Sequence, residues 1–331
     1  MIKPVTTVRA PALPAQAISN AARQVLWLGP IGAGVALLIA IIGRVPSSSV
    51  DVPLWVVTIA AIALAIGIPH GAVDHLILGS RLSRQRLFWL GLAYLLIATA
   101  ATVAILIAPA PALLVVVAMT VWHFGSGDIE AWRTLTNDPG KPVGWQRVLL
   151  IIAAGGAPVV LPLTSPAALA TLNTLNSELG ALWSAPATTV VRIAVLIAVV
   201  LAVVLLLHTQ RPWAAIQIMI LAALGIFAAP LLAFAMYFGV WHALRHTARL
   251  AFLRNGTVTW RGIGQVTAAG LPALVGSMIV VAVVLAFGGG IDRAAAWLWI
   301  GLAIVWGLTV PHMALVERFD RDQTREPAVP Q

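Results

Sequence analysis

The sequence contains no cysteine and very little charge, and both absences limit what the protein can be. Without cysteine there is no disulfide framework, no thiolate metal site and no cysteine nucleophile, so any metal must use histidine or carboxylate ligands. Only 9% of the 331 residues are charged, against roughly 25% in a soluble domain. Because 60% are hydrophobic, we infer that lipid surrounds most of the chain.

The hydrophobic residues form long continuous runs instead of alternating with polar ones. A bilayer leaves only helices or closed barrels as spanning structures, and continuous runs favour helices. The sequence therefore predicts an all-α, polytopic membrane helix bundle of about ten (8–10) transmembrane helices with a metal site inside it. The predicted spans are 25–43, 53–75, 87–108, 112–126, 147–164, 189–208, 213–229, 231–250, 266–288 and 295–316.

The remaining segments define the predicted domain organisation. Residues 1–24 are expected to form a flexible N-terminal tail, 25–316 the transmembrane domain and 317–331 a cytoplasmic C-terminal tail. Longer loops are expected at 127–146 and 165–188. Pro230 is interpreted as a tight turn between two spans, with a single kinked helix as the alternative.

The basic residues predict the orientation of the chain in the membrane. The net charge is +9, and the ten-span topology assigns 17 of the 20 Lys and Arg to the side that holds both termini. Such asymmetry is typical of cytoplasmic loops, so we expect a multi-pass protein of the cell membrane with both termini cytoplasmic. Because orientation in the membrane accounts for the basic residues, we do not expect nucleic acid as a partner.

The seven histidines all fall in the C-terminal parts of even-numbered predicted spans, close to the cytoplasmic side. Ionisable groups at membrane depth are costly and usually functional. His242 and His246 are four residues apart, so both rings project from one helical face and could supply two metal ligands. Their alternative role is hydrogen bonding to neighbouring helices. Two ligands do not complete a site, so other helices must contribute.

His70 and His123 are the next candidate ligands. His70 lies in GIPHGAVDH and His123 in VWHFGSGD, where glycines permit close helix approach. Asp74 and Asp128 follow them by four and five residues, and each could orient a metal-bound imidazole or instead cap a helix near the interface. An all-imidazole site suits iron, zinc, copper or nickel, and its place in a lipid-facing bundle suggests a lipophilic substrate.

Four other residues are candidates for the surroundings of the metal. Trp122 and Trp241 each precede a candidate ligand and could wall a hydrophobic channel or simply pack. Tyr237 is expected to be buried near the substrate, with a hydroxyl that needs a partner. His312 could be a ligand, a hydrogen-bond donor to one, or a pocket residue. Arg245, between the two paired histidines, is expected to snorkel toward the headgroups.

Four motifs in this order, PHGAVDH, WHFGSGD, WHALRH and TVPHM, resemble the Brp/Blh family of bacterial carotenoid-cleaving oxygenases. The resemblance covers about residues 55 to 318. It implies an integral-membrane, Fe(2+)-dependent enzyme that uses O2 to cleave β-carotene at its central 15,15′ double bond, giving two molecules of all-trans-retinal. Such an enzyme works within membrane lipid, and its product could supply a rhodopsin.

The resemblance also implies the ligand set. By position in the motifs, it assigns the iron to His70, His123, His242 and His246, and the family's late PH motif corresponds to His312. Two other functions remain open. A di-iron membrane desaturase or hydroxylase would need more histidine boxes than the single H-x-x-x-H pair present. A transporter or a haem-binding membrane protein is the non-enzymatic alternative.

Overall fold

The computed structural model of the chain describes residues 18–49, 51–73, 83–136, 138, 142–182, 185–287 and 291–325. In these ranges the chain is helical apart from its turns and one isolated bridge between Pro46 and Ala228. The helices are α1 (Asn20–Ile42), α2 (Leu54–Gly71), α4 (Arg84–Ile107), α5 (Pro109–Thr136), α6 (Gly144–Leu163), α7 (Pro166–Leu175), α8 (Ser177–Leu182), α9 (Ala185–His208), α10 (Pro212–Phe227), α11 (Pro230–Met236), the π-helix η1 (Tyr237–Ala243), α12 (Leu244–Asn255), α13 (Trp260–Phe287) and α14 (Ile291–Arg325).

Within the described ranges, seven helices are long and apolar enough to cross a membrane. They lie at Asn20–Ile42, Leu54–Gly71, Gln85–Ile107, Pro109–Thr136, Gly144–Leu163, Pro186–His208 and Trp299–Arg321. The predicted helical membrane bundle is therefore confirmed. Each of the ten predicted ranges coincides largely with a helix or with the continuous α11–η1–α12 segment, but the number of spans stays a prediction.

Several predicted boundaries fall inside helices. The predicted loop 127–146 is wrong in its first part, because α5 continues to Thr136. Its polar residues remain helical because they find partners within the protein, as Glu130 does with Arg133 at 2.6 Å. Likewise α7, α8 and the start of α9 occupy the predicted loop 165–188, and α14 continues past 316 to Arg325. At the N-terminus α1 begins at Asn20, and residues 1–17 lie outside the described ranges.

The predicted turn at Pro230 is confirmed, and the single kinked helix is wrong. Helix α10 ends at Phe227, and Pro230 begins α11 in a first-turn position, where its missing N–H removes no helical hydrogen bond. The backbone N–H of Ala229 donates to the carbonyl of Val45, 3.2 Å away. The turn therefore packs against the loop that follows α1.

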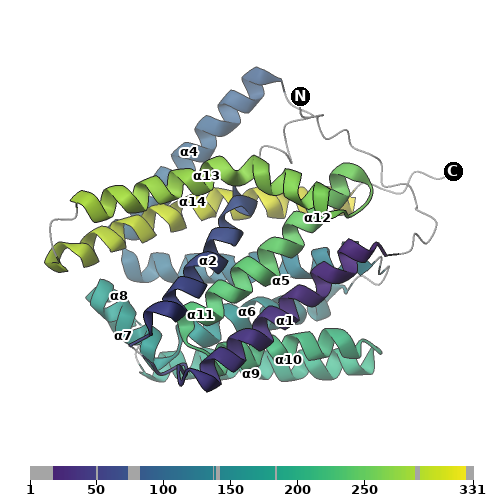
Figure 1. Cartoon of the computed structure of the whole chain (residues 1–331), viewed down its shortest axis with the longest axis horizontal. Coiled ribbons are helices and arrows are strands. Elements are labelled where there is room, and N and C mark those ends of the chain that lie inside the picture. The colour runs from purple at the N-terminus through teal and green to yellow at the C-terminus, as the bar shows by residue number, and fades with distance from the viewer. Residues whose placement is uncertain are drawn as a thin grey trace.

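The segment α11–η1–α12 runs as one continuous rod through the bundle, between α1 and α2 (Figure 1). Where it crosses α2, a Cβ on Gly239 would collide with the carbonyl of Ala63, and one on Gly67 with the ring of Phe238. Small residues let membrane helices approach closely. Helices α5 and α6 cross in the same way through Gly125 and Gly155.

The outer helices present large apolar side chains to the surroundings. On α9, for example, Ile197, Val200 and Val204 are each more than half exposed. In a membrane such side chains contact lipid. The buried polar side chains of the metal-site region lie on interior helices. The resulting bundle is apolar outside and has five buried histidines inside: His70, His123, His242, His246 and His312.

Candidate metal centre

Five of the seven histidines come together from five segments of the bundle. His70 ends α2, His123 lies in α5, His242 in η1, His246 in α12 and His312 in α14, and each is at most 6% exposed. Neighbouring ring centroids are 5.1–6.2 Å apart, from the His123–His312 pair to the His242–His246 pair. Helices that lie more than 200 residues apart in the sequence, such as α2 and α14, thus contribute to one polar site in the interior.

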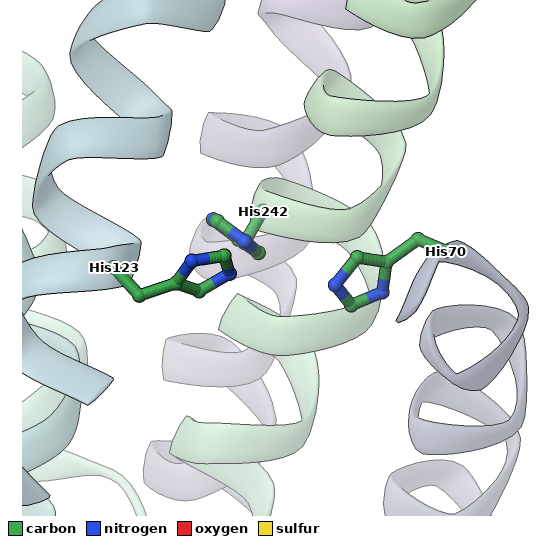
Figure 2. Close-up of side chains that lie close together, drawn as sticks. All are labelled: His70, His123 and His242. Atoms are coloured by element: carbon green, nitrogen blue, oxygen red, sulfur yellow. The ribbon is translucent and has the colours of Figure 1, made fainter. Parts of the chain in front are cut away.

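Three of these histidines form the centre of the cluster. His70, His123 and His242 point their rings toward one another from α2, α5 and η1 (Figure 2). One ring nitrogen of each lies within 4.8 Å of those of the other two. All three side chains are buried, so the group could hold one metal ion away from water.

The ring nitrogens of the cluster fit a metal. His123 Nε2, His242 Nε2 and both ring nitrogens of His246 are buried without a hydrogen-bond partner. A buried polar atom without a partner costs roughly 1–3 kcal/mol. Neutral imidazoles with unoccupied lone pairs in a group are the donors that iron, zinc, copper or nickel binds. A bound ion would give one nitrogen of each ring the partner that the protein does not supply.

Asp128, which the sequence suggested could orient a metal-bound imidazole, is hydrogen-bonded to His242 and not to the nearer residue in sequence, His123. Asp128 Oδ1 lies 3.1 Å from His242 Nδ1, and Asp128 Oδ2 accepts a hydrogen bond of 3.0 Å from the Tyr237 hydroxyl. Five residues along an α-helix is a rotation of about 140°, which turns Asp128 away from the His123 ring. With Nδ1 donating to the carboxylate, His242 keeps Nε2 available as a ligand atom.

A backbone carbonyl accepts the hydrogen bond from His70 that Asp128 accepts from His242. His70 Nδ1 is hydrogen-bonded to the carbonyl of Gly67, one turn earlier on α2. Donation from Nδ1 leaves Nε2 of His70 directed into the cluster. Asp74, the residue that the sequence suggested for this role, lies outside the described residues, as does His75.

His246 and His312 flank the three central rings. The His246 ring stacks on His242 with an interplanar angle of 16° and lies 5.6 Å from His70. The His312 ring lies 5.7 Å from His70 and close to Gly71. Both residues therefore lie beside the rings of His70, His123 and His242, and the ligand set stays a prediction.

A π-helix carries the central part of the site. Tyr237–Ala243 has π-helical hydrogen bonding between α11 and α12, and it contains both Tyr237 and His242. Such segments are rare and frequently occur at functional sites, because the extra residue in the turn changes where side chains point. The sequence interpretation missed it, since the hydrophobic pattern of YFGVWHA is that of an ordinary apolar helix.

The two tryptophans before the candidate ligands have different surroundings. Trp122 Nε1 donates to Glu317 Oε2 at 3.1 Å and so links α5 to α14. Trp241 is 1% exposed and lines a cavity of about 90 Å³, together with Asp128, Ala154 and Leu221. A wall role thus fits Trp241, whereas Trp122 is not among the residues that line this cavity.

The expectation that Arg245 snorkels to the headgroups is wrong. Its side chain is 2% exposed and lies over the Trp241 ring, 4.2 Å from the centroid. Arg245 Nη2 donates to Gln217 Oε1 at 2.7 Å and to the carbonyl of Leu26 at 3.3 Å. Polar partners within the bundle hold the guanidinium inside, so it has no need to extend to the membrane surface.

Comparisons with known proteins identify the family. A relative from Halobacterium salinarum, named "Probable beta-carotene 15,15'-dioxygenase Blh", is 26% identical over 343 residues, covering 94% of this chain and 96% of that protein. A relative from an uncultured marine bacterium (66A03), named "Beta-carotene 15,15'-dioxygenase", is 29% identical over 280 residues, covering 78% of this chain and 91% of that protein. No solved structure matches the chain.

The family match spans the whole histidine cluster. Residues 60–320 match the model of the family described as "Beta-carotene 15,15'-dioxygenase". Neither that family nor the two relatives is described as a desaturase, a transporter or a haem protein. Because the match covers most of the sequence, the chain belongs to the β-carotene 15,15′-dioxygenase family and is, with its family, an oxygenase.

Proposed function

We propose that this protein cleaves β-carotene at its central 15,15′ double bond with O2, at an Fe(2+) held by His70, His123, His242 and His246. One C=C bond is broken and two aldehyde C=O bonds form, so each β-carotene and O2 give two molecules of all-trans-retinal. The observation that carries the proposal is the buried His70–His123–His242 group in a chain of this family.

Each part of the site has a role that follows from its contacts. The imidazoles supply neutral nitrogen ligands, and an iron bound there would supply the activation of O2. Asp128 holds His242 in the tautomer and orientation that a ligand needs, and Tyr237 holds Asp128. The Gly67 carbonyl does the same for His70. The apolar helices around them exclude water, which protects an oxidising site from side reactions.

The membrane supplies the substrates and receives the products. β-Carotene is a hydrocarbon that dissolves in lipid, as O2 and retinal do, and the exposed apolar faces of the outer helices suit contact with lipid. We place the protein in the cell membrane with both termini cytoplasmic, from the distribution of its basic residues. Retinal released into the bilayer would be available to a rhodopsin.

Pigment analysis in a bacterial host that makes β-carotene tests the reaction. Cells expressing the protein should lose their yellow colour, and retinal should be recovered by chromatography. Cells expressing His242→Ala at an equal protein level should stay yellow. Shortened products other than retinal would show a different cleavage position, and unchanged β-carotene with folded, iron-loaded protein would contradict the proposal.

A further inference from the structure

Two buried arginines lie on the helix that carries the paired histidines. Arg245 and Arg249 are four residues apart on α12, so they share a face, about 100° and 60° respectively around the helix from His246. The two residues are 2% and 4% exposed. The predicted topology counted both among the charges on the cytoplasmic side of the membrane, yet both side chains are buried inside the bundle. Charged side chains at such positions are costly and usually have a function.

Arg245 connects α12 to two helices. Its Nη2 donates to Gln217 Oε1 on α10 at 2.7 Å and to the carbonyl of Leu26 on α1 at 3.3 Å. The guanidinium carbon also lies over the Trp241 ring, 4.2 Å from its centroid, within the range of a cation–π contact. Because a guanidinium is planar with donors at fixed angles, these contacts can be made together in few orientations of the helix.

Arg249 connects the same helix to α14. Its Nη2 lies 2.6 Å from Asp320 Oδ1, and both side chains are 5% exposed. Asp320 is eight residues, or roughly two turns, after His312 on α14. The ion pair therefore joins α12, which carries His246, to α14, which carries His312.

We propose that Arg245 and Arg249 are positioning residues that fix the rotation of the η1–α12 segment, so that His242 and His246 face the metal. This inference rests on the proposed metal centre. Between lipid-surrounded helices the hydrophobic effect does not select a rotation, and close packing and polar contacts have to do so. A rotation by one residue would move both histidines by about 100° and leave two buried guanidinium groups without acceptors.

Cobalt binding by the purified, metal-free protein tests the proposal without relying on turnover. Co²⁺ binds imidazole nitrogen, and its visible absorption spectrum reports the number and arrangement of ligands. The variants are Arg245→Lys, which keeps the charge but loses the planar fork, and the double variant Arg249→Met/Asp320→Leu. Removing both charges of a buried pair leaves neither one unpaired, so the double variant should unfold thermally near the wild-type temperature. Arg261→Met, at an exposed arginine of α13, is the control.

We expect both the lysine variant and the double variant to bind Co²⁺ at least about tenfold more weakly, with changed spectra, while the control matches the wild type. If both bind with wild-type affinity and spectrum, the arginines only stabilise the fold and the inference is wrong. Should the double variant not fold, Arg245→Lys decides alone. A wild-type protein that binds neither Co²⁺ nor Fe²⁺ would overturn the proposed metal centre, and this inference with it.

Discussion

Helices α9 and α12 show opposite uses of polarity in one bundle. Helix α9 consists almost entirely of aliphatic residues, yet many of them, such as Val200 and Leu201, are more than half exposed. Helix α12 carries a histidine and several arginines, yet its residues from Arg245 to Ala251 are buried. Because lipid surrounds the bundle, α9 can expose apolar side chains, and α12 can bury polar ones that find partners in the interior. The predictions below test this contrast in order of decreasing effect.

Removal of an inner histidine should have the largest effect. We expect His70→Ala, His123→Ala, His242→Ala and His246→Ala each to abolish retinal formation and to lower the iron content of the purified protein. The physical reason is that the remaining imidazoles cannot replace a missing ligand. Chromatography of retinal and metal analysis by mass spectrometry measure the two effects. An Ala variant that keeps full iron and turnover would remove its residue from the ligand set.

A side chain at the α2–η1 crossing should be nearly as damaging. Gly239→Val would place a branched side chain against the Ala63 carbonyl and push η1, with His242, away from α2, with His70. Overpacking of this kind costs typically 1–3 kcal/mol. We expect a lower thermal unfolding temperature in detergent and a strong loss of turnover.

The matched control lies on an outer helix. Gly91 on α4 has nothing near the position of an added Cβ, so Gly91→Val should change neither property. Equal effects of the two substitutions would mean that the close crossing does not position the site.

Loss of the carboxylate that orients His242 should have an intermediate effect. Asp128→Asn keeps the size of the side chain but removes the charge that accepts from His242 Nδ1 and from Tyr237. We expect about 10- to 100-fold weaker metal binding, the usual effect of losing such a partner. Titration of the metal-free protein measures it, and unchanged affinity would contradict the orienting role.

Removal of the Tyr237 hydroxyl should have a smaller effect in the same direction. Tyr237→Phe deletes one hydrogen bond to Asp128 and leaves the one to His242 in place. A hydrogen bond to a charged group contributes roughly 1.5–3 kcal/mol. Metal affinity should therefore fall, but less than in Asp128→Asn. A loss larger than that of Asp128→Asn would indicate that Tyr237 acts on the substrate or metal by itself.

A conservative change on the lipid-facing side should have almost no effect. Val200 on α9 is 61% exposed, so Val200→Leu adds one methylene where only lipid surrounds it. We expect unchanged retinal yield and an unchanged unfolding temperature. A marked loss of either would show that α9 packs against something in the membrane, and the contrast between the two helices would then need revision.

The helices could be predicted from the sequence because long apolar runs have one stable structure in lipid. Their ends could not, since residues such as Asp128 and Glu130 resemble a loop until their partners are known. The histidine cluster could be predicted from the four-residue spacing of His242 and His246 and from the position of the other histidines near the same end of their spans. The partner of Asp128, the π-helix and the burial of Arg245 depend on how distant helices pack, and no local pattern in the sequence encodes that.

Iron titration of the metal-free protein tests the central claim most directly. Protein stripped with a chelator is supplied with increasing Fe²⁺ in detergent containing β-carotene and O2, and retinal is quantified at each step. Retinal formation should be absent without iron and rise until a single ion is bound per chain, while His123→Ala should stay inactive throughout. Full activity of the stripped protein, or iron-dependent turnover by His123→Ala equal to that of the wild type, would contradict a histidine-held iron as the site of cleavage.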